Sequence, residues 1–110
     1  MITENEESRV QRSVTFEDKQ HFLTLLLFSI YVNCEALELR LKKIRTAKNE
    51  LYINRHAGNI SAAKFLEQEI VRYYDEADEY HSLIDAGLKR AYCLLQELKT
   101  MRELADVADV

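Results

Sequence analysis

Apolar residues between Phe16 and Leu51 recur in alternating steps of four and three, which is the spacing of a heptad seam along one long helix. The seam consists of Phe16, Gln20, Leu23, Leu27, Ile30, Cys34, Leu37, Leu41, Ile44, Lys48 and Leu51. Because no Pro or Gly interrupts this stretch, the pattern predicts a first helix over about residues 15–56. Thr15 and Asp18 have the spacing of an acidic capping box at its start.

The same helix carries a second apolar stripe on roughly the opposite side of its cylinder. Its members are Phe22, Leu25, Phe28, Val32, Ala36 and Leu39. A helix with two apolar stripes needs two partners, because each stripe is stabilised by removal from water. We therefore predict that these six residues form a protein interface.

A turn signal separates this helix from a second one. Gly58 suits the left-handed conformation that ends a helix, and Ser61 can cap the next helix. Ile60 and Phe65 stand at the positions of a hydrophobic staple. The second helix, over about residues 61–106, is predicted to be continuous because one seam passes through Gly87 without a change of phase. That seam consists of Ala63, Leu66, Ile70, Tyr73, Ala77, Tyr80, Ile84, Gly87, Ala91, Leu94, Leu98, Met101 and Ala105.

These elements predict an all-α fold, a long antiparallel helical hairpin with a short turn. A lone hairpin would leave the second stripe in water at a cost of ~1.5–3 kcal/mol per large apolar side chain. We expect two hairpins to meet through their first helices as a homodimeric four-helix bundle, with a different protein partner as the alternative. Residues 1–12 are polar and lack periodicity, so they are predicted to be a flexible N-terminal tail, and residues 13–110 a single hairpin domain.

Composition agrees with few, long helices in one domain. The chain has 110 residues, of which 47% are hydrophobic and 31% charged, with two Gly and no Pro. A formal net charge of −4 argues weakly against nucleic acid as the default partner and suits a cytoplasmic protein. The acidic first residues do not resemble a signal peptide, and the apolar run of residues 22–32 is shorter than the ~20 residues that cross a membrane. We therefore expect no membrane partner.

A basic cluster near the turn is the most specific polar feature. It comprises Arg40, Lys42, Lys43, Arg45, Lys48, Arg55 and Lys64, and the segment 40–64 contains a single carboxylate, Glu50. One interpretation is a polyanion-binding surface that holds the phosphates of RNA or DNA. The favoured interpretation is a solvated surface whose charges pair with carboxylates of the second helix.

Candidate metal ligands are sparse. Asp78 and His81 have i, i+3 spacing, and Glu17 and His21 have i, i+4 spacing, but no repeated pair supplies the other ligands of a bundle metal site. The sequence also lacks a Gly-rich phosphate loop and zinc-type spacing. We expect neither a metal nor a cofactor.

Candidate catalytic residues are equally few. Cys34 is interpreted as a small core residue on the first seam, and Cys34 and Cys93 as free thiols in a reducing compartment. Tyr73 and Tyr80 belong to the second seam and are predicted to pack in the core. The chain is therefore predicted not to be an enzyme, with a small helical enzyme that has no local motif as an alternative.

The predicted architecture resembles the small plasmid-encoded Rop proteins, helical hairpins that dimerise into a four-helix bundle and bind RNA. The chain is also similar in size to the WxG family of secreted helical hairpins. Residues 74–78 match that family's Y-x-x-x-D pattern, but in mid-helix, and the turn at 55–59 has no tryptophan. The sequence favours a non-enzymatic protein–protein interaction module, such as an adaptor, a small chaperone or an inhibitor. The alternative is a nucleic-acid-binding modulator that uses the basic turn end.

Overall fold

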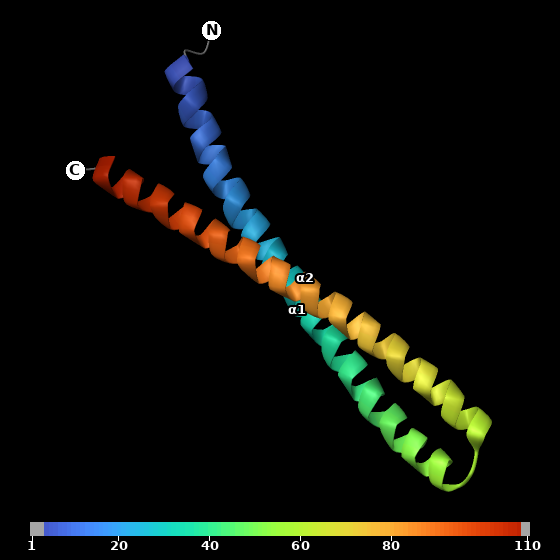
Figure 1. Cartoon of the computed structure of the whole chain (residues 1–110). Coiled ribbons are helices and arrows are strands. Elements are labelled where there is room, and N and C mark those ends of the chain that lie inside the picture. The colour runs from blue at the N-terminus through green and yellow to red at the C-terminus, as the bar shows by residue number, and fades with distance from the viewer. Residues whose placement is uncertain (1–3, 109–110) are drawn as a thin grey trace. The chain divides into compact units, whose positions relative to one another are not determined.

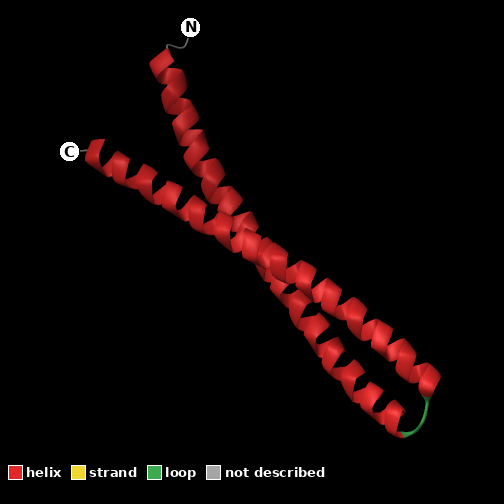
Figure 2. Cartoon of the chain, in the orientation of Figure 1, coloured by secondary structure: helices red, strands yellow, loops and turns green. Residues whose placement is uncertain are grey.

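The computed structural model describes the backbone of residues 4–108 and the side chains of residues 16–107. It consists of two α-helices, α1 (Glu4–His56) and α2 (Ile60–Ala108), which are joined by a turn at residues 57–59 (Figures 1 and 2). Residues 4–108 contain no β-strand. The predicted all-α helical hairpin is confirmed.

The first helix begins earlier than the sequence pattern indicated. It starts at Glu4 rather than near Thr15, so the described part of the predicted tail, residues 4–12, is helical; residues 1–3 lie outside the described residues. The predicted cap at Thr15 is wrong, because the helix already passes through that residue. The segment before Phe16 has no Pro or Gly to stop a helix.

The end of α1 is closed by a glycine, as predicted. Gly58 has a φ of 75°, a left-handed conformation that costs glycine nothing. The N–H of Asn59 donates to the carbonyl of Asn54 at 2.9 Å, and the N–H of Gly58 donates to the carbonyl of Arg55 at 3.2 Å. This pair of hydrogen bonds is a Schellman motif, and it satisfies two carbonyls that the helix end would otherwise leave without partners.

The start of α2 differs from the prediction. The Asn59 carbonyl accepts a hydrogen bond from the N–H of Ala63 at 3.0 Å, so Asn59 occupies the N-cap position instead of Ser61. Asn is as good an N-cap residue as Ser, and it comes two positions earlier. Ile60 and Phe65 consequently miss the positions of a hydrophobic staple, and both remain exposed, at 69% and 60%.

The helices pack in two compact units. Unit 1 joins α1 up to Ser29 with α2 from Ala86 onwards, and unit 2 is the continuous segment Ile30–Asp85, which includes the turn. In unit 2 the two helices run antiparallel away from the turn (Figure 1). Among residues 16–107, each unit is held by its own apolar seam and by ion pairs between the helices, one in unit 1 and two in unit 2.

The seam of α2 was predicted correctly at all positions but the last. Its buried or half-buried members are Ala63, Leu66, Ile70, Tyr73, Ala77, Tyr80 and Ile84 in unit 2, and Gly87, Ala91, Leu94, Leu98 and Met101 in unit 1. The predicted final member, Ala105, is exposed. The helix continues through Gly87, which confirms that this glycine does not break it.

The seam of α1 was predicted correctly at alternate positions only. Phe16, Leu23, Ile30, Leu37, Ile44 and Leu51 are buried or half-buried as expected. At the intervening positions the prediction is wrong by one residue. The residues that are buried or half-buried there are Lys19, Leu26, Asn33, Arg40, Ala47 and Asn54. The predicted residues that are exposed instead are Gln20, Leu27, Cys34, Leu41 and Lys48. Hydrophobicity alone does not separate the two sets, because Leu26 and Leu27 are equivalent and Ala47 is more apolar than Lys48.

Two ion pairs between the helices fit this register. In unit 2, Nε of Arg40 donates to the carboxylate of Glu76 at 2.5 Å, and its guanidinium lies 5.5 Å from the ring centroid of Tyr80. In unit 1, the ammonium of Lys19 lies 2.8 Å from the carboxylate of Glu97. Long basic side chains can cover apolar surface with their stems while their charged ends reach a carboxylate. Charge pairing with α2 therefore contributes to the choice of the face that α1 turns toward it.

Candidate interaction surfaces

The shifted register places the second apolar stripe beside the hairpin seam instead of opposite to it. Except for Phe28, each member of the stripe comes immediately before a seam residue. The adjacent pairs are Phe22–Leu23, Leu25–Leu26, Val32–Asn33, Ala36–Leu37 and Leu39–Arg40. One residue corresponds to about 100° of rotation around an α-helix. The two faces of α1 are thus about a quarter turn apart, which is the arrangement of a helix that contacts two neighbours in a bundle.

The α1 stripe, which is the set of six residues predicted as an interface, is largely uncovered. In unit 1, Phe22, Leu25 and Phe28 are exposed by 41%, 54% and 66%. In unit 2, Val32 and Leu39 are exposed by 44% and 49%, and Ala36 is half-buried. A contiguous row of large apolar side chains on a protein surface is typical of an interaction site.

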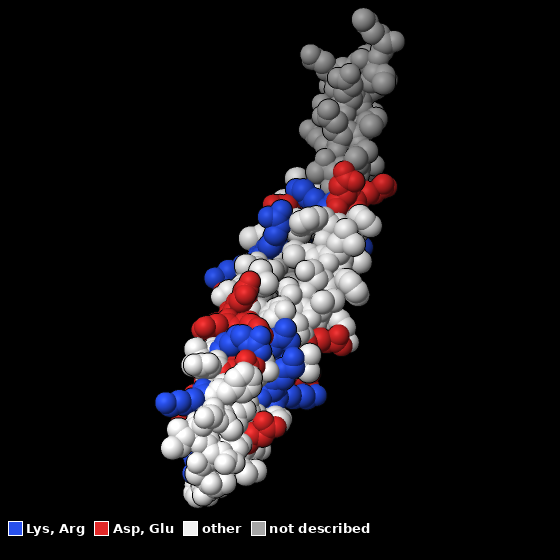
Figure 3. All heavy atoms as spheres, turned by 90° about the vertical axis from the view of Figure 1, so that its right-hand side faces the viewer, with Lys and Arg blue, Asp and Glu red and all other residues white. Residues whose placement is uncertain are grey.

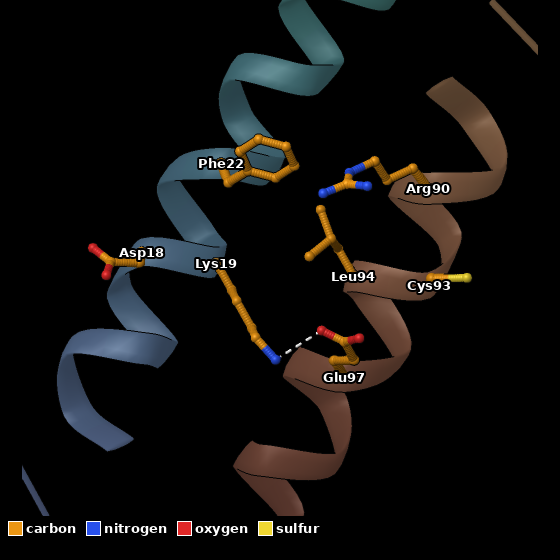
Figure 4. A pocket seen from close by; sticks show the side chains of 7 residues that line it. All are labelled: Asp18, Lys19, Phe22, Arg90, Cys93, Leu94 and Glu97. Atoms are coloured by element: carbon orange, nitrogen blue, oxygen red, sulfur yellow. Dashed lines mark ion pairs between the residues drawn. The ribbon is translucent and has the colours of Figure 1, made fainter. Parts of the chain in front are cut away.

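A hollow of about 560 Å³ in unit 1 borders the stripe at Phe22. It is lined by Asp18, Lys19, Phe22, Arg90, Cys93, Leu94 and Glu97. Figure 4 shows Phe22 and Arg90 facing one another across it, with the guanidinium 4.9 Å from the ring centroid. The carboxylate of Asp18 and the thiol of Cys93 point away from it in the same view. The hollow leaves room for another side chain beside the Phe22 ring.

Three further exposed leucines were missed by the sequence interpretation. Leu27, Leu88 and Leu95 of unit 1 are exposed by 49%, 52% and 51%. Leu27 had been assigned to the hairpin seam. Only the packing of the two helices reveals that these three leucines stay exposed, so the sequence held no local signal for them.

The predicted polyanion-binding residues all lie in unit 2, and several are paired with carboxylates. Arg40 pairs with Glu76 on α2, and Arg55 pairs with Glu67 on α2 at 2.5 Å. Lys42 lies 3.4 Å from Glu38 of its own helix, with both side chains largely exposed. The two arginine pairs are of the kind that the favoured interpretation of the cluster predicted.

Two lysines of the cluster lie over tyrosine rings. The ammonium of Lys43 is 5.7 Å from the ring centroid of Tyr73, and that of Lys48 is 5.1 Å from that of Tyr74. A cation over an aromatic face gains about 0.5–1 kcal/mol at exposed sites. Tyr73 is half-buried, so this predicted core tyrosine also serves as a platform for a cation at its rim.

The charge of the cluster is balanced by the neighbouring part of α2. Residues 40–64 carry seven cations and one carboxylate, a formal charge of +6, while residues 65–85 carry seven carboxylates and one arginine, a formal charge of −6. Figure 3 shows basic side chains gathered with acidic ones among them and no unbroken basic surface on the face in view. Such a mixed surface attracts polyanions much less than the count of lysines and arginines suggests.

Catalytic and metal-binding groups are not gathered in the described residues. Cys34 and Cys93 are free, exposed thiols, and the assignment of Cys34 to the core is wrong because the seam passes through Asn33. Among residues 16–107, no three His, Cys, Asp or Glu side chains are grouped so that they could hold a metal ion. Two of the four paired candidates, Asp78 and His81, are exposed on α2.

By length and composition alone, α1 is long and apolar enough to cross a membrane. Residues Phe16–His56 include an 18-residue window of mean hydropathy 1.6, of which 6% is buried. The sequence-based expectation considered only the shorter run of residues 22–32. The residues responsible for this hydropathy include the exposed α1 stripe, so the same surface accounts for both observations.

Comparisons with known proteins found no match to this chain. No protein-family model matches the chain, and neither a curated protein nor a solved structure matches it. A functional interpretation therefore depends on the surfaces described above.

Proposed function

We propose that the chain is a non-enzymatic protein–protein interaction module, of the adaptor, small-chaperone or inhibitor type, that works as a dimeric helical bundle. The observation that carries this proposal is the α1 stripe, an apolar row about a quarter turn from the hairpin seam. Burial of a large apolar side chain contributes ~1.5–3 kcal/mol, so covering this row is a strong driving force for association.

The angle between the two faces of α1 supports a bundle more than a flat stack of helices. In a four-helix bundle each helix contacts two neighbours, and its two contact faces are separated by roughly 90°. The stripe and the hairpin seam of α1 have about this separation, since every stripe residue except Phe28 precedes a seam residue. One face binds α2, and the other is available to a helix of a partner.

The mass of the chain in solution tests the proposal. Light scattering over a concentration series should give two chains of 12.9 kDa for the wild type. Val32→Asp should give one chain, because it places an unpaired charge in the middle of the interface. The matched control is Val71→Asp, the same substitution at an exposed position of α2, which should leave the dimer intact.

A wild-type monomer at all concentrations would overturn the dimer. Circular dichroism should show equal helix content in the three proteins, which excludes unfolding as the cause of a lost dimer. Sedimentation with phosphatidylcholine vesicles tests whether α1 binds a membrane instead of a protein. A monomer that cosediments, and that Val32→Asp releases, would replace the proposed protein partner by a lipid surface.

A further inference from the structure

We infer that the second partner of α1 is the α1 helix of another copy of this chain, and that the two helices run antiparallel. This inference rests on the proposed dimer and adds its orientation. The residues concerned form what we call the self-pairing seam: Asp18, Phe22, Leu25 and Ser29 in unit 1, and Val32, Ala36, Leu39 and Lys43 in unit 2. Their spacing alternates strictly between four and three, as in a coiled coil.

The seam reads the same in both directions, in steps of four, three, four, three, four, three and four. Two copies laid antiparallel therefore bring every seam residue opposite another seam residue. From the centre outward, the facing pairs are Ser29 with Val32, Leu25 with Ala36, Phe22 with Leu39, and Asp18 with Lys43. Each pair joins unit 1 of one copy to unit 2 of the other, and twofold symmetry repeats it.

Side-chain size is complementary in this alignment. A large residue faces a small one in the inner layers, where Leu25 meets Ala36 and Val32 meets Ser29. Alternation of large and small residues across facing positions allows two helices to interdigitate. In the next layer Leu39 faces Phe22, beside which the hollow of unit 1 provides space.

Charge determines the direction. Asp18 and Lys43 are both exposed, and neither makes an ion pair with any side chain of residues 16–107. The ammonium of Lys43 lies 5.7 Å from the ring centroid of Tyr73, a contact that satisfies no carboxylate and leaves its charge open to one. The carboxylate of Asp18 points away from α2 (Figure 4). An antiparallel pair places Asp18 next to Lys43 at both ends of the seam, whereas a parallel pair would place like charges together at both ends.

The same features favour a second copy over a different protein. Spacing in steps of four and three is common to all heptad seams, so the charges at the two ends carry this argument. A seam for another protein has no need to end in opposite charges, whereas an isologous interface gains from them because one patch must be complementary to itself. Asp18 and Lys43 supply the charges, and the apolar layers between them supply the contact area.

Charge exchange tests the orientation. Asp18→Lys and Lys43→Asp should each raise the dissociation constant of the dimer, by roughly tenfold, because each replaces two attractive pairs by two repulsive ones. The double variant with both substitutions restores opposite charges at both ends and should regain the wild-type dissociation constant. Single variants that dimerise like the wild type, or a double variant no tighter than the singles, would overturn the antiparallel pair.

Disulfide trapping gives an independent test on a background with Cys34→Ser and Cys93→Ser. Leu25→Cys and Ala36→Cys chains should cross-link when mixed, and neither should cross-link alone, since like positions would be about 16 Å apart along the axis. Efficient cross-linking of Leu25→Cys with itself would show a parallel pair and overturn the inference. That result would leave the proposed dimer intact, whereas a monomeric wild type would overturn both the dimer and its antiparallel orientation.

Discussion

Arg40 and Glu76 join the two helices of unit 2 through a hydrogen bond of 2.5 Å from the guanidinium Nε to the carboxylate. Their side chains are 21% and 32% exposed, so solvent screens this pair only in part. Glu76→Ala leaves the guanidinium without its carboxylate and should lower the free energy of unfolding by about 1 kcal/mol. Urea denaturation measures this loss.

The control for that prediction is a fully solvated ion pair on one helix. Glu38→Ala removes the partner of Lys42, where both side chains are more than 60% exposed, and should change stability by less than about 0.5 kcal/mol. Equal losses for the two variants would contradict a special role of Arg40 in setting the register.

The register of α1 predicts opposite behaviour for two adjacent leucines. Leu26 is half-buried in the hairpin seam, so Leu26→Ala should destabilise the chain by about 1–2 kcal/mol. Leu27 is 49% exposed, and Leu27→Ala should change stability by no more than about 0.5 kcal/mol. Thermal or urea unfolding distinguishes them, and a larger loss at Leu27 would restore the seam expected from sequence.

These leucines illustrate what could and could not be predicted. The α2 seam was predictable because that helix has one apolar stripe without competing positions. On α1, large apolar residues occupy three adjacent columns, represented by Leu25, Leu26 and Leu27, so hydrophobicity cannot select a face. Contacts with α2 contribute to the selection, since Lys19 and Arg40 reach the carboxylates of Glu97 and Glu76. That is a property of the packed pair of helices and is absent from either helix alone.

The geometry of the turn predicts that a substitution at Gly58 changes stability through the backbone conformation and not through a steric clash. Gly58 has a φ of 75°, and no heavy atom lies within 4 Å of the place where a Cβ would be added. Gly58→Ala should therefore destabilise the chain by about 1 kcal/mol through its backbone conformation alone. Gly58→Asn should lose less in urea denaturation, since Asn tolerates the left-handed region. A more stable Gly58→Ala variant would show that the turn has another conformation.

Tyr31 predicts a change in titration at high pH. Glu35 raises the pKa of the Tyr31 phenol above its ordinary value of 10.0, first through a hydrogen bond and then through charge repulsion. Because this pKa is raised in the folded state, the associated stabilisation is complete below pH 10 and is lost as the pH rises through the raised value. In Glu35→Gln the pKa should return toward 10.0, as measured by phenolate absorbance. The difference from Tyr31→Phe isolates this tyrosine, and an unchanged titration would exclude the contact.

The balanced charges of unit 2 predict weak binding to nucleic acid. Fluorescence anisotropy with labelled single-stranded RNA should show little binding by the wild type. Asp75→Asn, Asp78→Asn and Glu79→Gln together remove three exposed carboxylates and should strengthen binding and steepen its salt dependence. Tight, salt-sensitive binding by the wild type would instead support the polyanion interpretation of the basic cluster.

The three-residue turn decides which chain supplies each half of the hairpin. Only residues 57–59 separate two helices of 53 and 49 residues, and the left-handed Gly58 is where the chain reverses. If those residues became helical, α2 would leave its own α1 and could bind that of another copy. The pairs Arg40 with Glu76 and Lys19 with Glu97 could then form between two chains in place of one. The conformation of the turn therefore sets whether the seams join one chain or two, which the side chains of the seams cannot do.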